Sequence, residues 1–423
     1  MPQAGSQAEL QASYPSPTHS SPMIQRRVFF LLAALAAFAP LAIDLYLPSL
    51  AHIADSLRTT PARAQQTVSV FLAGFAVGML LYGPLSDRLG RRRIILIGTV
   101  VFVLASVACA LASSIEQLLT FRILQAFGGG AAAVVSRAIV RDLFEEREAA
   151  RVMAMVGMVT SFAPMIAPMA GAFILQLGSW RYEFVALALF GLACMVGSHR
   201  LLPETLQQGH AQASLMAAFR GYGTVLAQPS ARRLIVAGGA HFAAMFAYIT
   251  GTPYVYIQWF GLSETLYAVL FGSNIISLVA FGYLSSRWVA RLGPAKLALW
   301  GSRWALAGGA LVLLAALPGQ TGQWNLAGLA LGFLMAVGSI GWVSPNTMAQ
   351  LLAAHPKNAG AASALYGFAQ FGLGGLASVG VSWLHDGTAK PMAALVAAFL
   401  LLAAWASWAQ NGQPAPEQGH PLA

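Results

Sequence analysis

Long apolar runs separated by short polar segments dominate this sequence. A helix needs about 20 mostly apolar residues to cross the roughly 30 Å hydrocarbon layer of a membrane. Twelve such runs occur, at 27–49, 65–86, 94–113, 117–137, 152–175, 183–200, 232–257, 265–285, 297–317, 325–345, 359–383 and 391–410. The residues of 31–37 are continuously apolar, which predicts helices because the strands of a membrane barrel would alternate.

An internal repeat divides these runs into two sets of six. The segment 83–88, GPLSDR, ends the second run and returns as 282–287, GYLSSR, at the end of the eighth. We therefore predict an all-α integral membrane protein with twelve transmembrane helices in two pseudo-symmetric six-helix bundles. Parallel repeats of this kind are typical of transporters whose binding site lies between the repeats.

The polar segments set the predicted domain limits. They are a disordered cytoplasmic tail at 1–24, an N-terminal bundle at 25–202, a cytoplasmic linker at 203–230, a C-terminal bundle at 231–410 and a cytoplasmic tail at 411–423.

Composition agrees with a membrane protein and excludes several other classes. The chain is 57% hydrophobic and 9% charged, whereas soluble domains carry about 25% charged residues. Two cysteines exclude a disulfide scaffold, and the hydrophobicity excludes a disordered protein. No phosphate-binding loop for ATP occurs. A membrane-embedded enzyme would need clustered polar groups, but Cys109, Cys194 and His241 lie in different runs. We expect no metal site and no cofactor.

The net charge of +10 follows from membrane topology. Most basic residues fall in segments on one side of the predicted membrane, and the other side holds only Arg58, Arg63, Arg181 and Lys390. Cytoplasmic loops carry the excess of Lys and Arg, so both termini are predicted to be cytoplasmic. Nucleic-acid binding is not needed to explain the charge.

The loop after the second run is a candidate gating loop. Its candidate residues are Gly83, Asp87, Arg88, Gly90, Arg91 and Arg92. Gly83, Pro84 and Gly90 predict a tight reversal of the chain, with Asp87 near a helix N-terminus, where the helix dipole favours a carboxylate. The arginines alone are explained by orientation and by contact with lipid headgroups. Asp87 between glycines favours a contact that holds the two halves in one state.

Charges inside the runs point to a proton-coupling site. An ionised group within a membrane span is costly and by default marks function. Asp44 in the first run and Arg122 in the fourth are expected at similar depth. Desolvation favours the protonated carboxyl and a nearby arginine opposes this, so a moving arginine would make a proton switch. The alternative is a static ion pair, which is a poor source of stability. We assign Glu116 and Glu183, at the ends of runs, to the headgroup region.

The fifth run contains Pro164 and Pro168, which loosen or bend a helix. Ala163, Ala167 and Gly171 recur every four residues and allow close helix approach, which predicts a sealed interface. Isolated polar or aromatic groups in other runs are candidates for a substrate cavity, although each is more often a packing residue. They are Tyr46, Gln125, His241, Tyr248, Asn274, Asn346, Tyr366 and Gln370. A proton relay through His241 is an alternative to a pore-lining role.

Several motifs together resemble a known family. The segment 83–93, GPLSDRLGRRR, resembles the signature loop of the major facilitator superfamily. The segment 122–128, RILQAFG, is similar to the span-four motif of its proton-coupled members, and 163–171, APMIAPMAG, to the span-five motif of its drug/proton antiporters. With 44–48, DLYLP, and 141–142, RD, the chain resembles the bicyclomycin and chloramphenicol-resistance (Bcr/CflA) branch. Alanines at 163, 167 and 172 and a serine at 286 depart from the family pattern.

The resemblance implies a proton-coupled multidrug efflux antiporter of the bacterial cytoplasmic membrane. Asp44 and Arg122 fall on the family's proton-coupling positions, and the proton gradient would drive export of lipophilic or amphiphilic antibiotics. The expected partners are these small molecules, protons and membrane lipid, and we expect a monomer. An exporter of an endogenous metabolite on the same fold and a passive channel are the alternatives.

Overall fold

The computed structural model describes residues 22–144, 146–206, 215–317 and 322–408, so the predicted tail at 411–423 and most of the tail at 1–24 lie outside the described residues. Within these ranges the regular structure is entirely helical. The helices are α2 (Pro22–Ala36), α3 (Phe38–Asp44), η2 (Leu47–Ser49), α4 (Leu50–Ser56), α5 (Pro61–Leu89), α6 (Arg91–Leu111), α7 (Ile115–Leu143), α8 (Glu146–Leu175), α9 (Arg181–Leu201), α10 (Leu215–Ala227), α11 (Pro229–Thr252), η4 (Pro253–Trp259), α12 (Glu264–Ala316), α13 (Gln323–Gly338), α14 (Ile340–Ala354), η5 (Pro356–Asn358), α15 (Ala359–Trp383) and α16 (Lys390–Trp408).

These helices form the predicted spans, with some joined and others broken. As one straight helix the 53 residues of α12 would reach roughly 80 Å, more than twice the hydrocarbon thickness. The backbone of α12 turns at Gly293, so it contains the eighth and ninth spans. The first span consists of α2, α3, η2 and α4 and bends by 45° after Ala36. η4 continues α11, and α14 continues α13. Counted this way, the described residues contain the twelve predicted spans.

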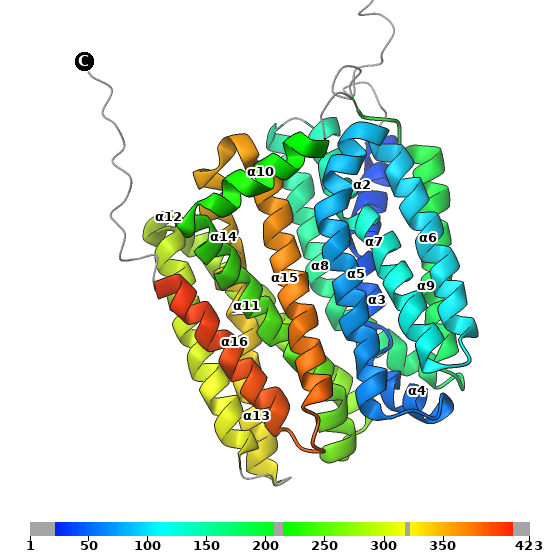
Figure 1. Cartoon of the computed structure of the whole chain (residues 1–423), viewed down its shortest axis with the longest axis vertical. Helices are drawn as coiled ribbons and strands as arrows, with labels where there is room; N and C mark the ends of the chain where they lie inside the picture. Colours follow the sequence, from blue (N-terminus) through cyan, green and yellow to red (C-terminus); the bar gives the residue numbers. More distant parts are fainter. Residues whose placement is uncertain (1–21, 145, 207–214, 318–321, 409–423) are drawn as a thin grey trace, which may run out of the picture.

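Two glycines with unusual backbone angles mark the internal repeat. Gly90 joins α5 to α6 with φ 99° and ψ 140°, and Gly293 separates the eighth and ninth spans with φ 77° and ψ 157°. Residues with a side chain rarely adopt positive φ, and glycine does so without strain. The same turn at the same place in each half supports the predicted pair of repeated six-helix bundles. Figure 1 shows the blue-to-cyan half beside the green-to-red half.

The two halves meet where α5 and α15 lie side by side (Figure 1). Ser69 Oγ donates to Ser378 Oγ at 2.7 Å, and the rings of Phe75 and Phe371 have centroids 4.5 Å apart. A second contact joins α8 to the first part of α12. The central part of the interface between the two halves therefore lies between these two helix pairs.

A helix not predicted from the sequence occurs within the predicted linker. This helix, α10, crosses one end of the bundle (Figure 1). The buried Tyr222 hydroxyl donates to the Leu80 carbonyl of α5 at 2.8 Å. Pro84, four residues later, has no N–H to bond that carbonyl, so Tyr222 supplies the missing donor. Burial raises the pKa of Tyr222 to about 12, and the charge of Asp87 adds to the shift.

Candidate functional site between the two halves

Asp44 ends α3 and lies at the interface between the halves. Its side chain is 3% exposed, and within the described ranges no hydrogen bond or ion pair reaches its buried Oδ1. Its carboxyl group interacts electrostatically with Tyr248 of α11 and Tyr267 of α12. Asp44 therefore faces the C-terminal half and not the surrounding lipid.

Arg122 of α7 is fully buried in the N-terminal half. Its Nη1 donates to the Ala42 carbonyl at 2.9 Å and to Gln125 Oε1 at 2.5 Å. Its Nη2 donates to the Tyr46 hydroxyl at 3.2 Å, and its Nε donates to the Thr67 carbonyl at 3.4 Å. These acceptors satisfy the guanidinium group without a carboxylate.

Aromatic rings complete the surroundings of Arg122. Its Cζ lies 4.5 Å from the ring centroid of Tyr46 and 4.3 Å from that of Phe71, distances typical of cation–π contacts. Ala42 and Tyr46 lie one helical turn apart and share a face, so Asp44 between them points the other way. Asp44 and Arg122 are not paired in this arrangement, although Arg122 of α7 donates to residues of the first span on both sides of Asp44.

The C-terminal half contributes a cluster of aromatic and amide groups opposite Asp44. Asn274 Nδ2 donates to the Tyr248 hydroxyl at 2.9 Å, and the Tyr248 ring packs on Phe271 and Phe333. Asn274 Oδ1 and the Tyr256 hydroxyl are buried without a partner within the described chain. Buried polar groups are almost always hydrogen-bonded, so this cluster has unused capacity for water or a ligand.

The other predicted cavity residues form separate contacts. Tyr366 and Gln370 both bond to Ser344, at 3.1 Å each. Asn346 donates to a serine hydroxyl of α12 at 2.7 Å, and His241 Nδ1 lies 3.0 Å from a carbonyl oxygen of its own helix. The predicted cavity residues are thus divided among several clusters, and Tyr248 belongs to the one that interacts with Asp44.

The fifth span packs directly beside Asp44. α8 is continuous through Pro164 and Pro168, and the small residues Ala163, Ala167 and Gly171 are buried. A Cβ built on Gly171 would lie 2.8 Å from the carbonyl carbon of Leu45 and would overlap its oxygen. A glycine at 171 is therefore required for α8 to approach the first span at the residue that follows Asp44.

The predicted location of Glu183 among the lipid headgroups is wrong. Glu183 is 0% exposed in α9, and its Oε1 accepts a hydrogen bond from Ser49 Oγ at 2.6 Å. Its Oε2 is buried without a partner among the described residues. The prediction was wrong because the broken first span covers this end of α9. Glu116, in contrast, is exposed and pairs with Arg63 at 2.8 Å.

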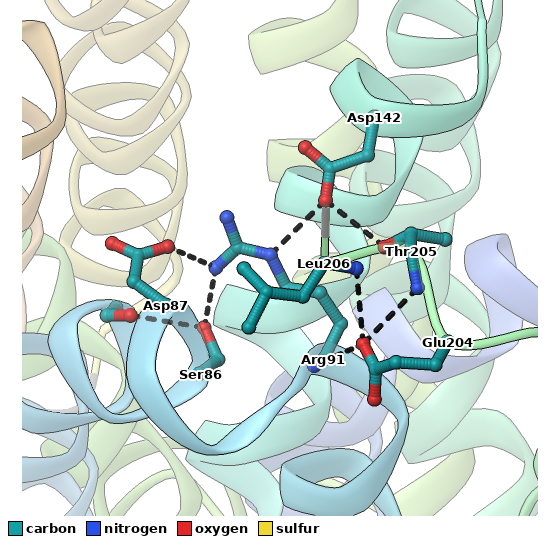
Figure 2. Close-up of polar contacts among 8 residues, drawn as sticks. Ser86, Asp87, Arg91, Asp142, Glu204, Thr205 and Leu206 are labelled. Atoms are coloured by element: carbon teal, nitrogen blue, oxygen red, sulfur yellow. Dashed lines mark hydrogen bonds and ion pairs between the residues drawn. The ribbon is translucent and has the colours of Figure 1, made fainter. Parts of the chain in front are cut away.

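The candidate gating loop is organised around Arg91 (Figure 2). The Arg91 guanidinium forms ion pairs with Asp87 and, through Nε, with Asp142 Oδ2 at 3.1 Å. It also donates to Ser86 Oγ at 2.6 Å. Glu204 Oε1, from the start of the linker, accepts the Arg91 backbone N–H at 2.8 Å. One arginine thus links the ends of three spans and the linker.

Two details of the predicted reversal were wrong. Gly83 and Pro84 do not end a helix, since α5 continues through both to Leu89. Asp87 therefore lies at the end of α5, and Glu204 is the carboxylate at the N-terminus of α6, where it complements the helix dipole. Arg92 donates to a carbonyl oxygen of α9 at 2.6 Å, and Arg88 is exposed. The ion pairs of this loop in the described residues stay within the N-terminal half.

Sequence reasoning missed several residues of these networks. They are Ser49, Thr67, Ser106, Glu204, Thr205 and Tyr267. Ser106 was detectable as a lone polar residue in an apolar run, whereas Thr67 lies among other polar residues at the start of the second run. Glu204 and Thr205 had no such signal because they lie in a polar linker.

Two repeated helical bundles that meet around buried charges define a membrane transporter. The chain belongs to the Major Facilitator Superfamily, which it matches over residues 32–379. It is a multi-pass membrane protein of this transporter family, as the motifs predicted.

Relatives and solved structures agree with this assignment. The chain is 30% identical to the "Bicyclomycin resistance protein homolog" of Haemophilus influenzae, covering 86% of this chain and 91% of the relative. It is 32% identical to the "Chloramphenicol resistance protein" of Pseudomonas aeruginosa, covering 86% and 85%. The xylose transporter XylE from E. coli has the same fold, with a TM-score of 0.72 over 93% of this chain and 100% of that one, at 15% identity.

Proposed function

We propose that this protein is a proton-coupled antiporter that exports lipophilic or amphiphilic antibiotics across the bacterial cytoplasmic membrane. Substrate binds between the two halves, which then rock to open outward, and both termini face the cytoplasm. The proton gradient supplies the energy. The observation that carries the proposal is the buried carboxyl group of Asp44 at the interface between the halves, whose Oδ1 has no partner among the described residues.

Asp44 is suited to exchange a proton for substrate. Ionising a buried carboxyl group without a cationic partner is costly, so we infer that Asp44 carries its proton in this arrangement. Opening of the interface on one side would admit water, stabilise the carboxylate and release the proton. Substrate then enters beside the unused polar groups of Tyr256 and Asn274.

Arg122 makes the second state of this switch accessible. It already contacts the first span on both sides of Asp44, at Ala42 and Tyr46. A rotation of this short segment would bring the carboxylate toward the guanidinium group. Pairing would then favour the ionised form, whereas the arrangement seen favours the protonated one.

The proposed substrate class follows from the lining and from the relatives. The surroundings of Asp44 are aromatic and apolar, with few polar groups, as in pockets for lipophilic ligands. Two relatives carry the names of bicyclomycin and chloramphenicol resistance. An exporter of an endogenous metabolite on the same fold is the second candidate, and a substrate screen separates the two.

The test is uptake of an antibiotic panel, with chloramphenicol first, into inverted membrane vesicles under an imposed proton gradient. We expect uptake that a protonophore abolishes, which a passive channel would not show. Asp44→Asn should abolish gradient-driven uptake, because the amide cannot bind and release a proton.

Asp55→Asn is the matched control, since Asp55 is an exposed aspartate of the same broken span. It should transport as the wild type does. Uptake at the wild-type rate by folded Asp44→Asn protein would remove Asp44 from the mechanism. Failure of every antibiotic, with uptake of a metabolite that requires Asp44, would favour the second candidate.

A further inference from the structure

The N-terminal half contains a second buried acid, Glu183, which the proposed mechanism does not use. It is as fully enclosed as Arg122, at 0% exposure. Its carboxyl group has one described hydrogen bond, from Ser49 Oγ to Oε1 at 2.6 Å. Its Oε2 is buried with no partner in the described part of the chain.

No cation described around Glu183 is directed at its carboxyl group. Arg122 lies over the neighbouring ring of Phe184, 5.8 Å from its centroid, with its donors on the acceptors given above. Arg181, on the same helix, donates to the carbonyl of Ala112 and to Ser56. The described ion pairs are those of Arg63 with Glu116 and of Arg91 with its two aspartates.

The remaining helices, over their described residues, contribute no charge that faces this acid. α6 has no charged residue from Ile94 onward, and its Cys109 interacts with Arg122 instead. α8 presents Gly171. In the first span Asp44 faces the other half, Tyr46 bonds to Thr67 at 2.9 Å, and the outer residues His52 and Asp55 are exposed.

These surroundings suit a neutral acid. A carboxylate at this position would keep a full negative charge with one hydrogen-bond donor, which is far more costly than one unsatisfied O–H group. The Ser49 bond is compatible with the neutral form, because the carbonyl oxygen of a protonated carboxyl group also accepts a hydrogen bond.

Glu183 also lies where it affects the first span. Ser49 ends η2, within the break that follows Asp44. A Cβ at Gly171 would be 3.5 Å from Glu183 Oε1, so the acid sits where the first span, α8 and α9 meet. The hydrogen bond between Ser49 and Glu183 links η2 of the first span to α9.

We propose that Glu183 is a second proton-binding site of this transporter. The protonated carboxyl group holds η2 against α8 and α9 in the arrangement seen. Its carboxylate, formed by loss of one proton to water when this end opens, releases η2 and the segment that carries Asp44. Binding of one proton from the external water restores the contact. The link to transport rests on the proposed function, whereas the proton site itself does not.

The first test needs no substrate. In lipid nanodiscs at about pH 7, where a free glutamate is ionised, the infrared spectrum should contain a carbonyl band of a protonated carboxylic acid. Subtraction of the Glu183→Gln spectrum should reveal this band. Glu116→Gln, at an exposed glutamate that begins the fourth span, should remove none of it.

Ser49→Ala supplies an independent readout if Glu183→Gln does not fold. It keeps the acid but removes the donor to Oε1, so the band should move to higher wavenumber. An unchanged spectrum in Ser49→Ala, or in folded Glu183→Gln, would overturn the second proton site whether or not the protein exports antibiotics.

The second test separates proton coupling from a structural role. The side-chain amide of the Glu183→Gln variant retains an oxygen that accepts the Ser49 bond, so a merely structural residue would leave transport by this variant unchanged. In inverted vesicles the lumen corresponds to the external side, so uptake is measured as a function of lumen pH. We expect the number of protons inferred from this dependence to fall from about two in the wild type to about one in the variant. An unaltered pH profile, with the infrared band present, would overturn the link to transport and leave the proton site standing.

Discussion

Substitution of Gly171 by alanine adds one methyl group to the contact between α8 and the first span beside Asp44. In a helix, alanine is favoured over glycine by about 1 kcal/mol, so Gly171→Ala would stabilise an unhindered α8. Here the added Cβ would lie 2.8 Å from the Leu45 carbonyl carbon and nearer still to its oxygen, whereas real Cβ contacts lie beyond 3.0 Å. The obstacle is backbone, so α8 and the first span must separate.

Overpacking of this kind costs about 1–3 kcal/mol. For a cooperative unit the size of one half, this corresponds to a fall of roughly 2–12 °C in the unfolding temperature. We expect Gly171→Ala to show this fall in detergent. The displacement of Leu45 should also slow proton-coupled uptake and increase proton leak through protein reconstituted in vesicles.

Gly157→Ala is the matched control. It lies in the same helix, and a Cβ there meets nothing within 4 Å, so it should be neutral or slightly stabilising. The two substitutions have the same intrinsic helix preference, and only their neighbours differ. Equal unfolding temperatures and equal leak for the two variants would refute the inferred contact between α8 and Leu45.

Three further predictions concern the α10 end of the bundle. Tyr222→Phe removes the donor to the Leu80 carbonyl and should lower the free energy of unfolding by about 1 kcal/mol. In the Pro84→Ala background the new backbone N–H can bond that carbonyl, so Tyr222→Phe should cost less in a double-mutant cycle of unfolding. Equal costs in the two backgrounds would contradict the pairing of Tyr222 with the Leu80 carbonyl. Since the pKa of Tyr222 is raised from 10.0 to about 12, the stability that its proton contributes should be constant below about pH 9 and be lost as the pH rises toward 12. Gly90→Ala would place a side chain at a positive φ and its Cβ 3.0 Å from the carboxyl carbon of Glu204, so it should lower the free energy of unfolding by at least about 1–2 kcal/mol. Gly83→Ala, whose Cβ would have nothing within 4 Å, should be tolerated. Similar unfolding temperatures for the two variants would exclude this difference.

The spans were predictable because lipid imposes a length and a composition that are visible in one sequence. The turn at Gly90 was predictable from the glycines and arginines around it, and its repeat at Gly293 from the return of RLG, residues 88–90, at 291–293. The direction of Asp44 was not, because α3 ends at that residue and the break after it depends on contacts with α8 and α9. Glu183 was misplaced for the same reason, since only the folded first span shows that the start of α9 is covered.

α10 was missed because its 13 residues are too few for a membrane span and include Gly221 and Gly223, which are unfavourable inside a helix. Helix formation there depends on docking to α5, where Pro84 leaves the Leu80 carbonyl without a backbone donor. A proline at the end of a span therefore has a partner that no local pattern reveals. The aspartate contacts of Arg91 were likewise set by which helix ends meet in space.

The two halves share a turn but not its surroundings. At Gly293 a Cβ would meet nothing within 4 Å, whereas Gly90 lies against the carboxyl group of Glu204. The turn of the first copy is thus joined through Glu204 to the segment that leaves its own bundle, whereas no described atom lies within 4 Å of a Cβ at Gly293. Substitutions around 293 should remain local in effect, while those around 90 should spread to the linker and so to the connection between the bundles.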